Sequence, residues 1–314
     1  MRQPYQAVLL IAFGGPNSSE EIRPFLARVT KGIPIPPARL EEVAHHYEAV
    51  GGKSPLNEIT FRQADALRKA LEAASIKIPV YVGLRNSSPF FVETLKRMAN
   101  EGVTRALGFI LSSHRTEASW DRYQKNVADA QVELGADTPA VDFCEGWHDH
   151  PLFIQTWSEL IEAALGKIPH DQRNVTPLLF TAHSLPTSMA ARSPYVEQLE
   201  TTARLVAEQL GHRRWSLAYQ SRSGKPSDPW LEPNISDAIR KAANEDCKEV
   251  VVAPIGFVCD HVEILYDLDI EAKKIAEDLD VHFHRASCPN DHPTFIRMIA
   301  DMIEKKLKTA ESRG

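Results

Sequence analysis

Two side chains that could share a metal ion, His183 and Glu263, each follow a run of apolar residues. The runs read TPLLFTA and EVVVAPIGF, and both are typical of buried strands. If they lie in one parallel sheet, His183 and Glu263 are at the edge where open α/β sheets bind ligands. A neutral imidazole and a carboxylate suit ferrous iron, and two ligands form an open site that transfers a metal. Taken alone, His183 could instead be a histidine hydrogen-bonded within a loop.

Carboxylates recur every four residues along the segment that contains Glu263. Glu263, Asp267 and Glu271 would be neighbours on a helix predicted over 262–278, where like charges cost roughly a few tenths of a kcal/mol per pair. Asp260 is predicted to be the N-cap of this helix, with Glu263 as its partner in a capping box. Asp267 and Glu271 form either a solvated acidic face or a path for a cation.

The composition is that of a globular chain whose partner is a small molecule. The 314 residues carry a net charge of −6, with 43% apolar and 25% charged residues, and no basic cluster indicates nucleic acid. No apolar run approaches the roughly 20 residues of a membrane span, and the start lacks a signal-peptide cleavage site. The four cysteines form no CxxC pair, so no disulfide framework is indicated. We expect a cytoplasmic protein, and the sequence leaves its oligomeric state open.

Short apolar runs rich in β-branched residues alternate with longer amphipathic segments. The first half contains AVLLIAF, IPVYVGL, RALGFIL and AVDFC, and the second half contains TPLLFTA, RWSLAYQ, EVVVAPIGF and DVHFHRA. This alternation predicts an α/β fold of two similar Rossmann-like domains, 1–150 and 151–314, each a parallel sheet flanked by helices. The last helix, from about Pro293 to Lys308, is expected to pack back on either half.

A short internal match supports a duplication of the two halves. Residues 8–16 align with residues 178–186, with three identities in nine positions. The alignment places Phe13 and His183 at equivalent positions, the carboxyl ends of the first strands of their halves. Ligands of open α/β sheets bind at these ends.

Two loops contain side chains that could line a substrate pocket. In YEAVGGKSPLN, Tyr47 precedes a flexible turn at Gly51 and Gly52, and Ser54 begins a helix. Ser54 is either a plain cap or part of a mobile lip whose hydroxyl binds a substrate carboxylate. In SDPWLEP, Trp230 lies between prolines, where a large aromatic side chain could flank a flat ligand.

Five motifs, in order along the chain, together resemble the ferrochelatase family. They are LLIAFGGPNSSEEIRPFL, YEAVGGKSPLNEIT, FTAHSLP, QSRSGKPSDPWLEP and PIGFVCDHVEILYDLDIEAK. The resemblance covers nearly the whole chain and is closest to soluble bacterial members, in particular actinobacterial-type coproporphyrin III ferrochelatases. It implies two chelatase-type domains with a porphyrin cleft between them, and insertion of ferrous iron, as a substrate, into the porphyrin.

By motif, the resemblance assigns the reaction to His183 and Glu263, as catalytic residues and metal ligands. It assigns an acidic path for metal or protons to Asp267 and Glu271. Inserting a dication into a free-base porphyrin releases two pyrrole protons, so the site needs a base above the ring. His183 can accept a proton, while Glu263 holds the cation or relays the proton outwards. A cleft that binds a bent macrocycle best would lower the barrier.

The resemblance also implies a set of porphyrin contacts, in which this chain departs from some relatives. Phe13 stands where some soluble relatives carry a tyrosine implicated in metal contact. Lys31 and His46 replace propionate-binding arginines of some relatives, which leaves Ser54 and Tyr123 as the better matches. The predicted porphyrin-binding residues are Phe13, Lys31, His46, Tyr47, Ser54, Tyr123 and Trp230.

No iron–sulfur cluster is expected in this chain. Many actinobacterial relatives bind a two-iron two-sulfur cluster through four cysteines, one of them in the helix that here reads ASWDRYQKN. That position corresponds to Trp120, and no group of cysteines follows Cys288. A cluster needs four thiolates within reach.

The resemblance predicts an enzyme of haem biosynthesis, a lyase that converts coproporphyrin III to coprohaem. Protoporphyrin IX is the alternative substrate. Two other functions stay open. One is a porphyrin- or haem-binding protein of the same fold that inserts no metal, which the change at Phe13 keeps open. The other is a cobalt or nickel chelatase, but these usually rely on a pair of histidines, whereas the five motifs here match ferrochelatase.

Overall fold

The computed structural model describes residues 4–32, 35–223 and 228–312. The chain forms two units, each built around a four-stranded parallel sheet. Unit 1 comprises residues 1–112, 117–146 and 291–314, and unit 2 comprises residues 113–116 and 147–290. The main division thus falls close to the boundary predicted at residue 150, and the last helix belongs with the first unit.

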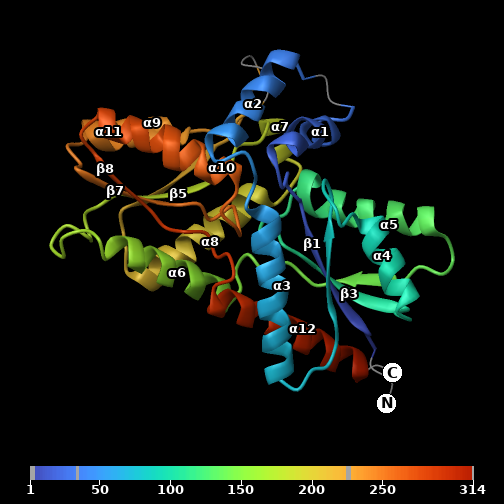
Figure 1. The fold of residues 1–314 in the computed structure, drawn as a ribbon. Coiled ribbons are helices and arrows are strands. Elements are labelled where there is room, and N and C mark those ends of the chain that lie inside the picture. Colours follow the sequence, from blue (N-terminus) through green and yellow to red (C-terminus); the bar gives the residue numbers. More distant parts are fainter. Residues whose placement is uncertain (1–3, 33–34, 224–227, 313–314) are drawn as a thin grey trace. The chain divides into compact units, whose positions relative to one another are not determined.

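Unit 1 has the strand order β2-β1-β3-β4, with every neighbouring pair parallel. The strands are β1 (Ala7–Ala12), β2 (Val80–Leu84), β3 (Arg105–Ile110) and β4 (Ala140–Phe143). The helices are α1 (Ser19–Val29), α2 (Pro37–Ala49), α3 (Leu56–Ala73), α4 (Phe91–Asn100), the π-helix η1 (Glu117–Asp121), α5 (Arg122–Leu134) and α12 (Pro293–Glu311). Helix α3 packs against α12 and α4 packs against α5, and Figure 1 shows these two pairs on opposite faces of the sheet.

Unit 2 repeats this order as β6-β5-β7-β8, again with parallel neighbours. The strands are β5 (Leu178–His183), β6 (Trp215–Gln220), β7 (Glu249–Ala253) and β8 (His282–Arg285). The helices are α6 (Pro151–Leu165), α7 (Thr187–Ala190), α8 (Tyr195–Leu210), α9 (Ile235–Asn244), α10 (Val262–Leu265), the π-helix η2 (Asp267–Ala272) and α11 (Lys273–Asp278). Helices α6 and α8 cover one face of the sheet and α9 and α11 the other (Figure 1). The two predicted α/β halves with parallel sheets are confirmed.

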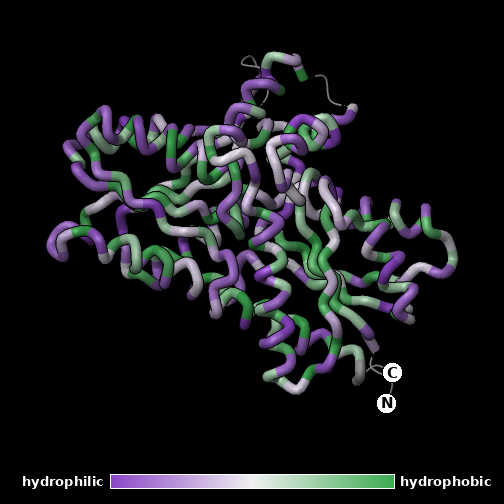
Figure 2. Tube along the Cα trace, in the orientation of Figure 1, coloured by the Kyte–Doolittle hydropathy of each residue, from purple (hydrophilic) through white to green (hydrophobic). Residues whose placement is uncertain are grey.

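The central strands are mostly apolar and buried, because helices cover both faces of each sheet. All six residues of β1 are buried, and so are the first five of β5. Figure 2 shows this as hydrophobic colour along the strands, while the helices alternate between hydrophobic and hydrophilic positions. A continuous apolar run, rather than an alternating one, is the pattern of a strand buried on both sides.

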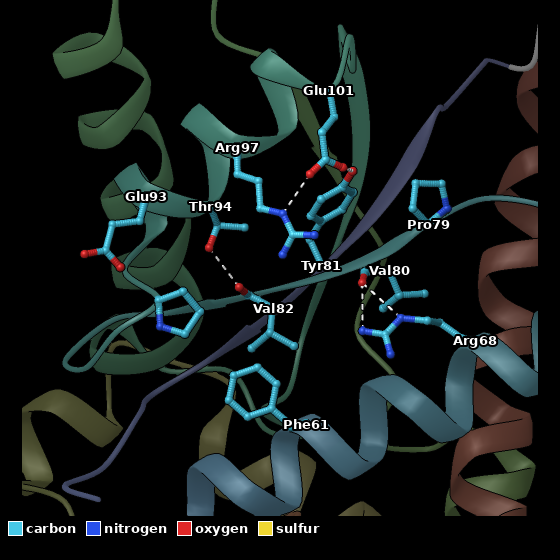
Figure 3. A pocket seen from close by; sticks show the side chains of 11 residues that line it. Phe61, Arg68, Pro79, Val80, Tyr81, Val82, Glu93, Thr94, Arg97 and Glu101 are labelled. Atoms are coloured by element: carbon cyan, nitrogen blue, oxygen red, sulfur yellow. Dashed lines mark hydrogen bonds and ion pairs between the residues drawn. The ribbon is translucent and has the colours of Figure 1, made fainter.

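The edge strand β2 is protected by side chains from the helices beside it. The backbone oxygen of Val80 accepts hydrogen bonds from Arg68 (Nε 3.3 Å, Nη2 3.2 Å), and that of Val82 accepts from the Thr94 hydroxyl (2.8 Å). These groups line a pocket of about 400 Å³, shown in Figure 3. Two charged side chains of this pocket, Arg97 and Glu101, form an ion pair (2.8 Å). We therefore infer that the side chains lining this pocket cap the edge of the sheet.

Among the helices of the described residues, none is both long enough and apolar enough to cross a membrane.

Candidate active site

The structure brings His183 and Glu263 together at the carboxyl edge of the second sheet. His183 is the last residue of β5, and Glu263 lies in α10, which follows β7. Nε2 of His183 is 3.8 Å from Oε1 of Glu263, and the two side chains are 30% and 38% exposed. This distance exceeds a hydrogen bond, and the partial exposure makes both the imidazole and the carboxylate accessible from solvent.

The surroundings of His183 fix which ring nitrogen faces Glu263. Nδ1 lies 2.5 Å from the backbone oxygen of Ser184, and because a carbonyl oxygen only accepts, Nδ1 must donate. In the neutral ring, Nε2 therefore carries the lone pair that can bind a metal or accept a proton. The hydroxyl of Tyr195 donates to the backbone oxygen of His183 (3.0 Å). Burial raises the pKa of Tyr195, so this hydroxyl stays a neutral donor.

Two side chains hold the backbone of Glu263. Its N–H donates to Nδ1 of His261 (3.2 Å), which is the N-cap of α10. Burial lowers the pKa of His261, which keeps the ring neutral and able to accept. The backbone oxygen of Glu263 accepts from Nε2 of Gln220 (2.7 Å). The carboxylate therefore projects from a backbone that is fixed at both its N–H and its C=O.

The prediction that Asp260 caps this helix was wrong, since His261 occupies the cap position. Asp260 instead accepts from Nη1 of Arg285 (2.8 Å) and from Nδ2 of Asn290 (2.6 Å). Arg285, the last residue of β8, also binds both carboxylate oxygens of Asp269 (2.6 and 2.8 Å). A bidentate guanidinium thus ties the segment before α10 to the π-helix after it.

The predicted helical stretch over 262–278 is helical for nearly its whole length, but its middle is the π-helix η2 rather than an α-helix. The N–H of Glu271 donates to the backbone oxygen of Tyr266 (3.0 Å), five residues earlier. The acids therefore do not stack at the spacing of an α-helix. On the inner side, Leu268 is fully buried in the core of unit 2. Asp267 accepts a hydrogen bond from the hydroxyl of Ser221.

The last of the three acids is the most exposed to solvent. Glu263 and Asp267 are partly buried, whereas Glu271 is exposed. The burial of these acids is compatible with a solvated acidic face and with a path for a cation. Glu271 can belong to a solvated face, while Asp267 lies close enough to the interior to accept a hydrogen bond from Ser221.

In unit 1, the predicted porphyrin contacts Phe13 and Tyr47 are joined through Phe25. The ring centroids of Phe13 and Phe25 are 6.3 Å apart, and those of Phe25 and Tyr47 are 6.0 Å apart, both edge to face. Phe13 follows β1, as predicted, and Tyr47 is buried in α2. Phe25 and Tyr47 are buried and Phe13 is partly buried, so Phe13 is the most accessible ring of this cluster.

Arg85 is a candidate that the sequence reasoning missed. It follows β2, and its guanidinium lies 5.7 Å from the centre of the Phe13 ring. Its Nη1 donates a long hydrogen bond to the backbone oxygen of Ala118 (3.3 Å). Burial lowers its pKa, and no carboxylate of the described residues forms an ion pair with it. A half-buried guanidinium without a carboxylate partner is suited to binding a ligand's carboxylate.

The remaining predicted contacts lie in different surroundings. Ser54 is 5% exposed and its hydroxyl accepts from the N–H of Leu56 (3.3 Å), but the N-cap of α3 is Pro55 rather than Ser54. Burial, followed by the charge of Arg39, lowers the pKa of His46, which favours its neutral form. Lys31 is exposed after α1, and Tyr123 is buried in α5.

Trp230 lies beside the segment that follows His183. Its backbone forms an antiparallel bridge with Pro186, and the neighbouring Leu231 accepts from the hydroxyl of Ser184 (2.9 Å). The indole nitrogen of Trp230 is buried. The structure therefore ties the Trp230 loop to the histidine segment within unit 2.

Three of the cysteines, Cys144, Cys259 and Cys288, are buried in environments that favour the thiol form. Burial raises the pKa of Cys144 and of Cys259 to about 12, and it also raises that of Cys288. Trp120 is buried, and its indole N–H donates to the backbone oxygen of Ser112 (2.9 Å). Protonated thiols are poor cluster ligands, and the absence of an iron–sulfur cluster remains a prediction. Within the described ranges, no three His, Cys, Asp or Glu side chains form a group that could hold a metal ion.

Comparison with known proteins gives a consistent family match. The family model described as ferrochelatase matches residues 5–307. The chain is 40% identical to a ferrochelatase of Rhodopirellula baltica, over 97% of this chain and 87% of that protein. It is 37% identical to the coproporphyrin III ferrochelatase of Mycolicibacterium smegmatis, over 96% and 90% of the two chains. It is also 37% identical to the coproporphyrin III ferrochelatase of Streptomyces coelicolor, over 99% and 87%.

Among solved structures, the chain resembles SirB from Bacillus subtilis with Fe3+. The TM-score is 0.61 at 11% sequence identity, covering 98% of both chains. At that identity the likeness shows the fold alone, a chelatase-like arrangement of two parallel sheets flanked by helices.

Proposed function

Because this chain belongs to the ferrochelatase family, we propose that it inserts ferrous iron into coproporphyrin III and releases coprohaem. The chain is an enzyme, a lyase of haem biosynthesis. Support for coproporphyrin III comes from the relatives of that name, which match over nearly the full length. Protoporphyrin IX is the alternative substrate. We also keep the predictions of a cytoplasmic location and of no iron–sulfur cluster.

The observation that carries the mechanism is the pair of His183 and Glu263, 3.8 Å apart and partly exposed. Metal insertion brings in a dication and releases two pyrrole protons. In our proposal, Nε2 of His183 accepts a pyrrole proton, because Nδ1 is already committed to Ser184. The carboxylate of Glu263 holds the incoming cation or passes the proton outwards. Asp267 and Glu271 continue that path towards solvent.

In the same proposal, the aromatic cluster of unit 1 contacts the macrocycle and polar groups near it bind the propionates. Phe13 offers a ring but no metal ligand, so metal contact is left to His183 and Glu263. Arg85, beside Phe13, is the propionate partner that the geometry favours most. The other proposed contacts are Lys31, His46, Tyr47, Ser54, Tyr123 and Trp230.

Two measurements test the proposed reaction and substrate. Anaerobic incubation with ferrous iron and free-base porphyrin should reduce the four Q-bands to two, whereas binding alone would shift the Soret band and leave four. Initial rates on coproporphyrin III and protoporphyrin IX then compare the substrates, because two additional propionates are the main difference between them. A higher kcat/KM on protoporphyrin IX would overturn the coproporphyrin assignment.

A further inference from the structure

Gln220 connects the strand of His183 to the backbone of Glu263. It is the last residue of β6 and lies opposite His183 in the parallel register of β5 and β6. Its side chain is 1% exposed, and a buried amide must satisfy both its oxygen and its nitrogen. Oε1 accepts from the hydroxyl of Thr181 (2.9 Å), and Nε2 donates to the backbone oxygen of Glu263 (2.7 Å).

The backbone of Gln220 adds a third connection. Its oxygen accepts from the N–H of Ser184 (2.7 Å). Gln220 therefore binds the residue directly after His183 and, through Thr181, a residue two positions before it. The histidine is held on both sides by the same residue that holds Glu263.

We propose that Gln220 is a positioning residue for metal insertion, which sets the separation between His183 Nε2 and Glu263 Oε1. This inference rests on the roles proposed above for these two side chains. The Gln220 amide is neutral and buried, so it acts through geometry rather than by exchanging protons or touching the porphyrin. A displacement of about 1 Å in a reacting group can cost about 10²-fold in rate.

The next residue extends the connection to the acidic path. Ser221 has a left-handed backbone (φ 62°), a conformation that non-glycine residues adopt infrequently. In this conformation its hydroxyl donates to the carboxylate of Asp267. Two successive residues at the end of β6 thus hold two of the acids that we assign to metal and proton transfer.

The test is Gln220→Met, which removes both amide hydrogen bonds at nearly constant side-chain size. The matched control is Gln131→Met in unit 1, because Gln131 also donates from Nε2 to a backbone oxygen, that of Pro139 (2.8 Å). For each variant, kcat, the KM for ferrous iron, the KM for porphyrin and the melting temperature are measured under anaerobic conditions.

We expect Gln220→Met to lower kcat by about 30- to 100-fold while the KM for porphyrin stays within about twofold. The control is expected to keep kcat within about twofold of the wild type, even if its melting temperature falls as far as that of Gln220→Met. A folded Gln220→Met variant with a wild-type kcat would overturn the positioning role. So would an equal loss of kcat in the control.

Two milder variants decide the matter if Gln220→Met does not fold. Thr181→Val removes only the bond to Oε1, and Gln220→Asn keeps the amide on a side chain shorter by one methylene. We expect each to lower kcat by about 3- to 10-fold, with an unchanged KM for porphyrin. An unchanged kcat in either folded variant overturns the inference.

Glu263→Gln separates this inference from the proposed function. If that variant keeps the wild-type kcat, the proposed role of Glu263 and the positioning role of Gln220 are both wrong. If Glu263→Gln loses turnover while Gln220→Met retains it, the proposed function is supported and the positioning role alone is overturned.

Discussion

The two sheets share one strand order, yet the carboxyl ends of their central strands carry different chemistry. In unit 1, β1 leads to Phe13, which contacts Phe25 and lies beside Arg85. In unit 2, β5 ends at His183, which faces Glu263. Two sheets of the same strand order can therefore serve different roles. We propose that the sheet of unit 2 moves protons and metal, and that the sheet of unit 1 binds the ring and its carboxylates.

The largest expected effect comes from removing the imidazole at the reacting edge. His183→Ala should lower the rate of iron insertion by about 10³-fold, because general-base catalysis contributes about 10²- to 10⁴-fold. Porphyrin affinity, measured by quenching of intrinsic fluorescence, should change by less than about threefold. Retention of more than a tenth of the wild-type rate would refute the division of roles between the two sheets.

The partly buried ion pairs of Arg285 in unit 2 should matter more for stability than exposed pairs of unit 1. Arg285→Met leaves Asp260 and Asp269 without their guanidinium, and we expect it to lower the free energy of unfolding by about 3 kcal/mol. The control is Arg97→Met, which breaks an exposed pair with Glu101 and should cost less than about 1 kcal/mol. Urea denaturation measures both, and equal losses would show that the Arg285 contacts add nothing beyond a surface pair.

At the carboxyl end of the unit 1 sheet, removing the charge of Arg85 should weaken porphyrin binding rather than slow turnover. Arg85→Leu is expected to raise the KM for coproporphyrin III by about tenfold, since a charge-assisted hydrogen bond contributes about 1.5–3 kcal/mol. The kcat should stay within about threefold, and the KM for protoporphyrin IX should rise less. Initial-rate kinetics on both porphyrins decide it; a fall in kcat at constant KM would place Arg85 in the reaction instead.

The acidic path should show itself in the dependence on iron concentration. The double variant Asp267→Asn and Glu271→Gln is expected to raise the KM for ferrous iron by about five- to tenfold, through the loss of two negative charges near the entering cation. Glu271→Gln alone should have a smaller effect, because that side chain is exposed. An unchanged KM in the double variant would return both acids to a solvated surface role.

The smallest effect is expected from adding a side-chain hydroxyl at Phe13, which follows β1. Phe13→Tyr introduces a hydroxyl where the structure has only a ring, and it should change kcat with ferrous iron by less than about threefold. Anaerobic insertion kinetics measure the change. A gain of tenfold or more would show that the first sheet also supplies a metal ligand, and that the contrast between the two edges is incomplete.

The parts of this site that sequence could predict are those with a local pattern. His183 follows an apolar run and Glu263 lies shortly after another, and parallel strands bring their carboxyl ends to one edge. Their meeting therefore followed from the order of strands. The same signal was available for Gln220, which ends RWSLAYQ, and for Arg85, which follows IPVYVGL, but it was not applied to them.

Other features depend on contacts between distant segments and leave no local signal. Arg285 binds Asp260 and Asp269, and nothing in the residues around Asp260 distinguishes an ion-paired carboxylate from a helix cap. The π-helix was missed for a related reason: a spacing of four residues between acids also fits a regular α-helix. Within the π-helix, Leu268 packs in the core and Asp267 is hydrogen-bonded to Ser221, and neither contact can be read from the neighbouring residues.

The capped edge of β2 has a consequence for the behaviour of the protein at high concentration. A foreign strand could pair with β2 only by displacing the Arg68 guanidinium and the Thr94 hydroxyl from the oxygens of Val80 and Val82. Losing those bonds would offset the gain from new backbone pairing. The β2 edge is therefore a poor template for aggregation through strand pairing.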